Sequence, residues 1–171
     1  MATAVSRADL PANVTIRSDL KPGDTGYVIY LHGILYAMEH GWDCTFEAYV
    51  AGPLAEFVTS PTDRGRMWIV ERDGEVAGSI AVVEVSHEQA QLRWLLLHPD
   101  LRGQGIGRLL VQEAIGFCKA SGYSSIFLWT VSSLTSATNL YESVGFGLTE
   151  EKTHRAWGAL ITEQRYDLEL R

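Results

Sequence analysis

The spacing of apolar residues predicts a strand and two helices in the first third of the chain. Residues 24–40 show helical spacing, with one apolar stripe made of Tyr27, Leu31, Ile34, Leu35 and Met38. Residues 44–59 repeat this spacing, although Pro53 inside them indicates a kink or a break. A short alternating segment at residues 14–17 precedes both helices and predicts a strand.

The rest of the chain switches between strand and helix patterns. Asp73 and Gly74 give a two-residue hairpin signal between apolar runs at residues 66–71 and 75–85. The elements predicted after this hairpin are a strand at 91–97, an amphipathic helix at 105–121, a strand buried on both faces at 125–131, a short helix at 136–144 and a hairpin at 148–170. This order predicts an α/β fold in which helices flank one mixed sheet.

Composition and charge restrict the class of protein. The 171 residues fit one domain, which we expect to span residues 13–171 behind a flexible tail at residues 1–12. The formal net charge of −7, from 21 acidic and 14 basic residues, argues against nucleic acid as the main partner. The two cysteines, Cys44 and Cys118, lie at no metal-ligand spacing, so we expect no metal. No signal-peptide pattern and no run near the ~20 apolar residues of a membrane span occur, which predicts a cytoplasmic protein without a membrane partner.

A glycine-rich turn between a predicted strand and a predicted helix is the strongest candidate for ligand binding. Residues 98–108 read HPDLRGQGIGR. Free main-chain N–H groups at a helix start carry about half a positive charge, and glycines let an anion approach them closely. The turn therefore predicts a pyrophosphate site flanked by Arg102 and Arg108, although glycines needed only for tight packing would give the same pattern. Arg108 replaces the third glycine of a dinucleotide fingerprint, and the G-K-[ST] of a P-loop is absent.

A second stretch follows about thirty residues later, after the strand at 125–131. Residues 139–146 read NLYESVGF and contain Tyr141 and Phe146, which would also fit as aromatic core residues around a helix end. Together, "LRGQGIGRLL" and "ATNLYESVGF" resemble the acetyl-CoA-binding core of GNAT N-acetyltransferases, with the same element order over roughly residues 14–170. The resemblance implies a mostly antiparallel sheet splayed between its fourth and fifth strands, with acetyl-CoA in the gap.

The resemblance also implies a set of residues that contact acetyl-CoA. Leu95 and Leu97 would offer main-chain groups to pantetheine and to the developing oxyanion, and Asn139 and Tyr141 would contact CoA from the following helix. The pyrophosphate would lie on the turn made of Arg102, Gly103, Gln104, Gly105, Ile106, Gly107 and Arg108. Tyr141 would donate a proton, or only a hydrogen bond, to the leaving sulfur.

A narrower resemblance concerns residues 31–51, "LHGILYAMEHGWDCTFEAYVA". This segment is similar to the acetyltransferase half of proteins in which a winged-helix regulator is fused to a GNAT domain. No winged helix is present in this sequence, so no DNA-binding function is inferred. GNAT relatives often dimerise, and a homodimer is therefore a further expectation.

The acceptor side is less well defined by the sequence. An amine must lose a proton before it attacks a thioester, so a base is useful. His32, Tyr36 and Glu39 form one ridge at i, i+4 and i+7 on the first long helix, and Glu39 is the predicted catalytic base or anchor. The ridge would equally fit a solvated flank, with Glu84 as a second candidate base. Further candidates for the wall of the acceptor pocket are Trp42, Arg93 and Trp129.

The sequence thus predicts an acyltransferase that moves an acetyl group from acetyl-CoA to a primary amine by direct attack in a ternary complex. Two alternatives remain open at this point. The fold could serve as an acyl-CoA-binding sensor or partner-binding module without catalysis, or the enzyme could transfer another acyl group, such as succinyl or propionyl.

Overall fold

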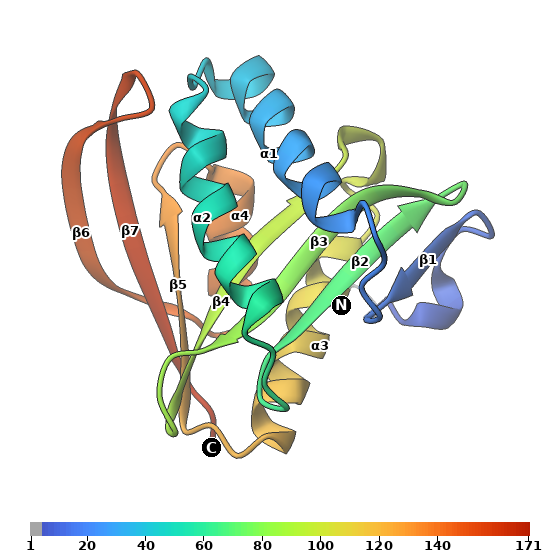
Figure 1. Ribbon diagram of the computed structural model, residues 1–171. Coiled ribbons are helices and arrows are strands. Elements are labelled where there is room, and N and C mark those ends of the chain that lie inside the picture. Colours follow the sequence, from blue (N-terminus) through green and yellow to red (C-terminus); the bar gives the residue numbers. More distant parts are fainter. Residues whose placement is uncertain (1–4) are drawn as a thin grey trace.

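A computed structural model describes residues 5–171 of the chain; residues 1–4, part of the predicted tail, lie outside the described residues. One seven-stranded sheet has the order β1-β2-β3-β4-β5-β7-β6, and β4 and β5 form its parallel pair (Figure 1). The strands are β1 Val14–Arg17, β2 Arg66–Arg72, β3 Glu75–Glu84, β4 Gln89–Leu97, β5 Ser125–Val131, β6 Gly147–Ala156 and β7 Ala159–Glu169. The helices are α1 Asp24–His40, α2 Thr45–Thr59, α3 Ile106–Ala120 and α4 Thr135–Ser143, with short 3-10 helices at Arg7–Asp9 and Pro99–Leu101.

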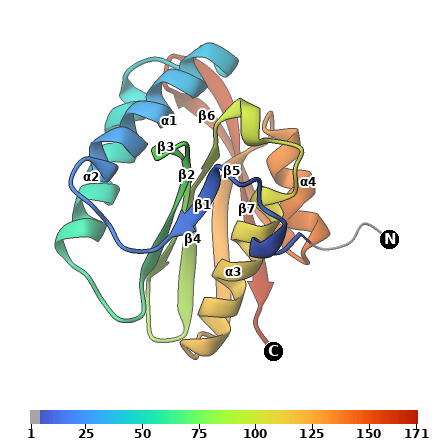
Figure 2. The same cartoon turned by 90° about the vertical axis from the view of Figure 1, so that its right-hand side faces the viewer.

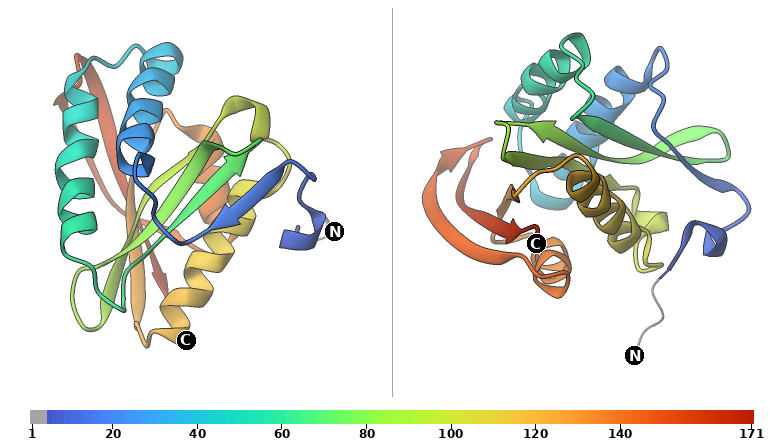
Figure 3. Two further views of the ribbon diagram at one scale, coloured as in Figure 1. Left: turned by 45° about the vertical axis from the view of Figure 1, so that its right-hand side comes forward. Right: turned by 90° about the horizontal axis from the view of Figure 1, so that it is seen from below.

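Helices cover both faces of the sheet. Helices α1 and α2 lie on one face, and α3 and α4 lie on the other (Figures 2 and 3). Each face has its own apolar core, one built around α3 and one around α2. The predicted α/β fold with a mixed, mostly antiparallel sheet is therefore confirmed.

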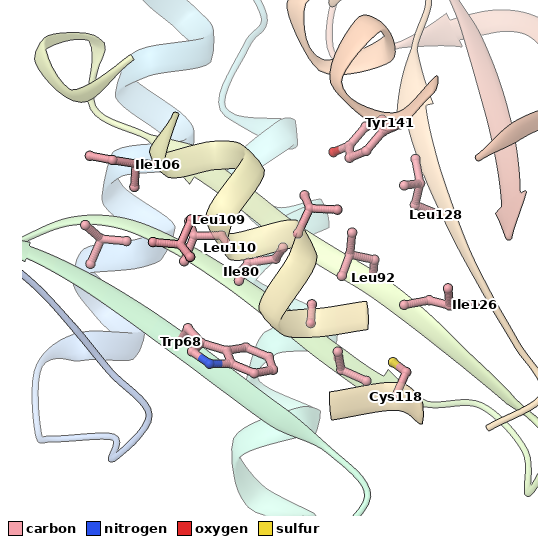
Figure 4. Packing of buried hydrophobic residues seen from close by; sticks show 14 of the residues in the cluster. Trp68, Ile80, Leu92, Ile106, Leu109, Leu110, Cys118, Ile126, Leu128 and Tyr141 are labelled. Carbon is pink, nitrogen blue, oxygen red and sulfur yellow. The ribbon is translucent and has the colours of Figure 1, made fainter. Parts of the chain in front are cut away.

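The core under α3 is formed by one face of that helix, as its amphipathic pattern predicts. Ile106, Leu109, Leu110 and Cys118 are buried against strand residues, as Figure 4 shows. Burial raises the pKa of the Cys118 thiol to about 12, so Cys118 is an inert apolar residue at neutral pH. The strand predicted to be buried on both faces, β5, has five of its seven residues buried.

The inward face of α1 differs from the predicted stripe. Tyr27, Ile34 and Met38 are exposed, whereas Val28 and His32 are buried together with Leu31 and Leu35. The buried residues have helical spacing too, because the residues on any one face of a helix recur at that spacing. The positions of the sheet and of α2 decide which face of α1 is buried. Of the two alternatives predicted at Pro53, a kink or a break, the break does not occur, since α2 continues through this residue.

The N-terminal residues that the structure describes contact the rest of the molecule. Arg7 pairs with Glu113 on α3 at 2.6 Å, and its Nη1 donates to the carbonyl oxygen of Ile16 at 2.9 Å. The side chain of Val5 lies at Gly105, where an added Cβ would meet its Cγ2 at 2.5 Å. Within residues 5–171, no helix is long and apolar enough to cross a membrane.

Candidate functional site

Strands β4 and β5 separate after their first three residue pairs. Only Gln89–Gln91 of β4 pairs with β5, at Ser125–Phe127. Beyond these pairs β5 stays on β7 as far as Val131, while β4 stays on β3 as far as Leu97. The sheet therefore opens into a V-shaped gap on the carboxyl side of both strands, as expected for the fold that the sequence resembles.

A bulge in β4 shapes one wall of this gap. Arg93 pairs with Ala81 and Leu96 pairs with Ser79, so two residues of β4 have no partner in the ladder between β3 and β4. The first of these, Trp94, has a positive φ of 53°, and its carbonyl oxygen accepts a hydrogen bond of 2.7 Å from the Ser79 hydroxyl. The second is Leu95, whose main chain is therefore available to a ligand in the gap.

The glycine turn lies at the mouth of the gap and presents unpaired main-chain donors. Gly103 and Gly105 have φ of 73° and 81°, values that only glycine adopts without strain. Within residues 5–171, no acceptor is found for the main-chain N–H groups from Gly103 to Arg108, whereas Leu109 N–H donates to the Gly105 carbonyl. The N-cap residue of α3 is Gly105, which has no side chain to cap the helix. Six consecutive free N–H groups at a helix start fit the pyrophosphate of a nucleotide.

The two arginines of the turn differ in their contacts. Arg102 makes a two-pronged ion pair with Glu39 at 2.8–2.9 Å, and its Nε donates to the Leu97 carbonyl oxygen at 3.0 Å. Arg108 is exposed, and its Nη1 donates to the Ser143 hydroxyl at 2.9 Å. The predicted base Glu39 is thus held by Arg102 at the turn, and it lines the same groove as Tyr36.

Two cavities meet in the gap. A groove of about 380 Å³ runs from the turn into the gap, between Leu97, Gly107 and Leu140 on one side and Glu39 on the other. A pocket of about 120 Å³ continues from it between β4, β5 and the helices α1 and α2. The residues common to both are Tyr36, Leu95, Leu134 and Ala137. A long acyl carrier in the groove and a second substrate in the pocket would therefore meet near Leu95.

Tyr141 reaches the pocket from α4. Its ring is 6% exposed and packs beside Leu128, with the hydroxyl directed away from that residue (Figure 4). Tyr141 lines the pocket from this position. Burial first, and then nearby Tyr36, raises the pKa of Tyr141, so its phenol keeps the proton at neutral pH. Asn139 is exposed on α4 and lines neither cavity.

The pocket is walled by aromatic rings. Tyr36 stacks on Trp42 with their ring centres 5.1 Å apart. The centre of the Trp157 ring lies 4.7 Å from that of Trp42 and 4.9 Å from that of Phe46. Trp129 also lines the pocket. Electron-rich ring faces of this kind attract cations, including an alkylammonium group.

His32 is a neutral member of this wall. It is 3% exposed, and its Nδ1 lies 2.8 Å from the Val28 carbonyl oxygen, where only an Nδ1–H can donate. Burial lowers the pKa of His32 to about 4. The ring is therefore uncharged at neutral pH and too weak a base to deprotonate an amine.

The structure adds Glu163, Tyr49 and Trp157 to the pocket, which the sequence did not predict. Glu163 is 9% exposed, and its Oε2 lies 2.6 Å from His154 Nε2. Its only signal in the sequence is its position two residues after Ile161 on a strand, which places both on one face. Glu84, the second candidate base, instead pairs with Arg64 at 3.0 Å and lines neither of the two cavities.

Within residues 5–171, no group of three or more His, Cys, Asp or Glu side chains could hold a metal ion.

Comparisons with known proteins agree with this geometry. The model of the acetyltransferase (GNAT) family matches residues 34–146. An uncharacterised N-acetyltransferase of Schizosaccharomyces pombe is 34% identical over 125 residues, which cover 70% of this chain and 74% of the relative. Human N-acetyltransferase 8B is 31% identical over 99 residues, covering 55% of this chain and 44% of that protein. The chain thus spans less than half the length of the curated mammalian relatives that it matches.

Solved structures support the same fold. The crystal structure of a GNAT family acetyltransferase from Elizabethkingia anophelis, with acetyl-CoA bound, has a TM-score of 0.66 at 19% sequence identity. The match covers 94% of this chain and all (100%) of that chain.

Proposed function

The chain belongs to the acetyltransferase (GNAT) family, and we propose that it transfers the acetyl group of acetyl-CoA to a primary amine. The observation that carries this proposal is the junction of the two cavities. An anion-binding helix start and an open strand lead directly to an aromatic pocket next to Tyr141.

The described residues fit acetyl-CoA. The free N–H groups from Gly103 to Arg108 would hold the pyrophosphate, and Arg102 and Arg108 would add positive charge. The main chain at Leu95 and Leu97 would hold the pantetheine in the gap. Acetyl-CoA supplies a thioester whose carbonyl carbon an amine can attack. We propose that Asn139 contributes to CoA binding from the exposed side of α4.

Tyr141 would assist the departure of the sulfur. A thiol has a pKa of about 8.5, well below the raised pKa of Tyr141, so full proton transfer to the thiolate is uphill. The phenol would instead donate a hydrogen bond that strengthens as negative charge develops on sulfur. Burial keeps Tyr141 protonated throughout the pH range in which an amine can react.

The amine needs help to lose its proton. An alkylamine with a pKa of about 10.4 requires about 4.6 kcal/mol for deprotonation at pH 7, at 1.36 kcal/mol per pKa unit. Glu39 remains our proposal for the carboxylate that accepts this proton or anchors the amine. An anion at the glycine turn would compete with Glu39 for Arg102, and release would leave Glu39 beside Tyr36, at the junction of the cavities.

Glu163 is a second carboxylate, and it lines the pocket itself. It comes from β7 and is held by His154 at 2.6 Å and by Lys152 at 3.6 Å. The two candidate bases can be distinguished by experiment, because only the position of Glu39 depends on whether Arg102 binds a ligand.

Other parts of the proposal rest on the sequence. We propose that residues 13–171 act as one domain, that the protein is cytoplasmic and that it forms a homodimer. We also propose, from residues 31–51, a relationship to the acetyltransferase half of winged-helix fusion proteins.

The test is a screen for amine-dependent CoA release, with calorimetry of acetyl-CoA binding in parallel. Binding with amine-dependent release supports an acetyltransferase. Binding without release for any amine would indicate a sensor, and faster release from succinyl-CoA or propionyl-CoA would indicate a different acyl group.

A further inference from the structure

Arg93 differs from the other partly buried arginines among residues 5–171 because its guanidinium has no carboxylate partner. Four other arginines in the described residues are also partly buried, and each has a carboxylate within 3.0 Å: Arg17, Arg64, Arg72 and Arg165. Arg93 is half-buried, yet among residues 5–171 no carboxylate pairs with it. A guanidinium removed from water without an anionic partner is unfavourable, and such groups are retained where they bind a ligand.

At the bulge in β4, Arg93 lines the acceptor pocket and also a neighbouring cavity of about 230 Å³ beside α2. Arg93 and Trp94 are consecutive, yet both lie on the side of the sheet that α2 covers, because the bulge interrupts the alternation. The Arg93 guanidinium lies 4.9 Å from the centre of the Trp94 ring, and Arg93 lines the pocket with Tyr49. Burial lowers the pKa of Arg93, as expected where no carboxylate compensates for lost hydration.

The same pocket contains a buried charge of the opposite sign. Glu163 lines it from β7, and the aromatic wall with Trp42 and Trp157 lies in the same pocket. The pKa of Tyr49, raised by burial, responds to Arg93, Glu163 and Lys152, so this ring lies within reach of all three charges. Lys152 lies 3.6 Å from Glu163, whereas Arg93 has no carboxylate among residues 5–171. An acceptor that brings its own carboxylate to Arg93 would complement this charge arrangement.

We propose that the acceptor is an amine that carries a carboxylate, of the free amino acid type, and that Arg93 binds this carboxylate. Arg93 is then a specificity-determining residue, and Glu163 with the aromatic wall receives the ammonium end. The inference rests on the proposed acetyl transfer, since it names the acceptor class for that reaction. Arginine suits the role because its planar fork offers two parallel donors to a carboxylate.

The experiment compares matched acceptors. For the side chains of leucine, methionine and phenylalanine, kcat/KM is measured with the amino acid, its amide and the amine without the carboxylate. We expect the wild-type protein to favour the amino acid by about 10- to 100-fold, the range of a charge-assisted hydrogen-bond pair. In Arg93→Gln this preference should disappear, while Arg93→Lys should keep part of it.

Arg66→Gln is the matched control. Arg66 is exposed and lies 4.5 Å from the centre of the Phe117 ring, but lines neither cavity of the gap, so its removal should leave the preference unchanged. Acetyl-CoA binding measured by calorimetry should be the same in all variants. A wild type that favours the amide or the simple amine, or an Arg93→Gln variant that keeps the preference, overturns the proposal.

A binding measurement separates this proposal from the transfer reaction. Each amino acid and its amide are titrated against the tryptophan fluorescence of the CoA-saturated protein. Binding that favours the carboxylate and is lost in Arg93→Gln supports the subsite even if no acetyl group is transferred, in which case only the proposed function fails. No carboxylate preference in binding or in transfer overturns the subsite alone.

Discussion

Gly107→Val tests the acetyl-CoA groove with little disturbance of the fold. Gly107 lies in the first turn of α3 and lines the groove. A Cβ added there would meet Leu140 Cδ2 at 3.5 Å and Leu97 Cδ1 at 3.6 Å, which is ordinary contact. The two γ-methyl groups of valine would extend about 1.5 Å further, into the space between Leu97 and Leu140.

The expected effect on binding follows from this overlap. Overfilling a packed site raises the free energy by about 1–3 kcal/mol, which corresponds to about 5- to 150-fold weaker acetyl-CoA binding. Stability should change little, because glycine is the poorer helix former by a few tenths of a kcal/mol and this gain offsets part of any strain. Calorimetry gives the dissociation constant, and thermal denaturation checks the fold.

Gly116→Val is the matched control. Gly116 lies on the same helix, and an added Cβ would meet nothing within 4 Å. It makes the same change in helix propensity without entering the groove, so it should bind acetyl-CoA like the wild type. Unchanged acetyl-CoA affinity in a folded Gly107→Val protein would refute the assignment of the groove.

Three further predictions follow from the site. Tyr141→Phe should lower kcat by up to about 10²-fold with a smaller change in the KM for acetyl-CoA. If steady-state kinetics give the variant the kcat of the wild type, the ring only packs in the core. If Glu39 is the base, Glu39→Gln should lower kcat/KM at neutral pH, and kcat/KM should recover as the pH approaches the pKa of the amine. If Glu163→Gln shows this recovery and Glu39→Gln does not, Glu163 is the base. The depressed pKa of His32, about 4 in the fold against 6.5 unfolded, means that the unfolded chain binds more protons between these values. The free energy of unfolding should therefore fall as the pH drops from 6.5 toward 4, and urea titrations of His32→Gln should lack that slope.

The sequence predicted those features that depend on neighbouring residues. The glycine turn and the start of α3 follow from a few consecutive residues, because positive φ and free N–H groups are local properties. The amphipathic pattern of α3 is equally local, and the helix forms within the predicted range. The hairpin at Asp73 and Gly74 has the two-residue turn that its sequence demands.

Features that depend on distant segments were harder to predict. The buried face of α1 includes His32, a polar residue that the apolar stripe had left outside. The pocket combines Arg93 of β4 with Glu163 of β7, and only the completed sheet brings them together. The ion pair between Arg102 and Glu39 likewise joins residues 63 positions apart, so no local pattern could indicate it.

The most direct test of the account follows an isotopically labelled acetyl group. The protein is mixed with labelled acetyl-CoA, first alone and then with an accepted amine, and the products are identified by mass spectrometry. The account predicts that the label moves to the amine nitrogen with release of one CoA per product, and that no acetylated protein forms without the amine. Label that accumulates on the protein would contradict direct attack, and label that never reaches an amine, although acetyl-CoA binds, would contradict the proposed function.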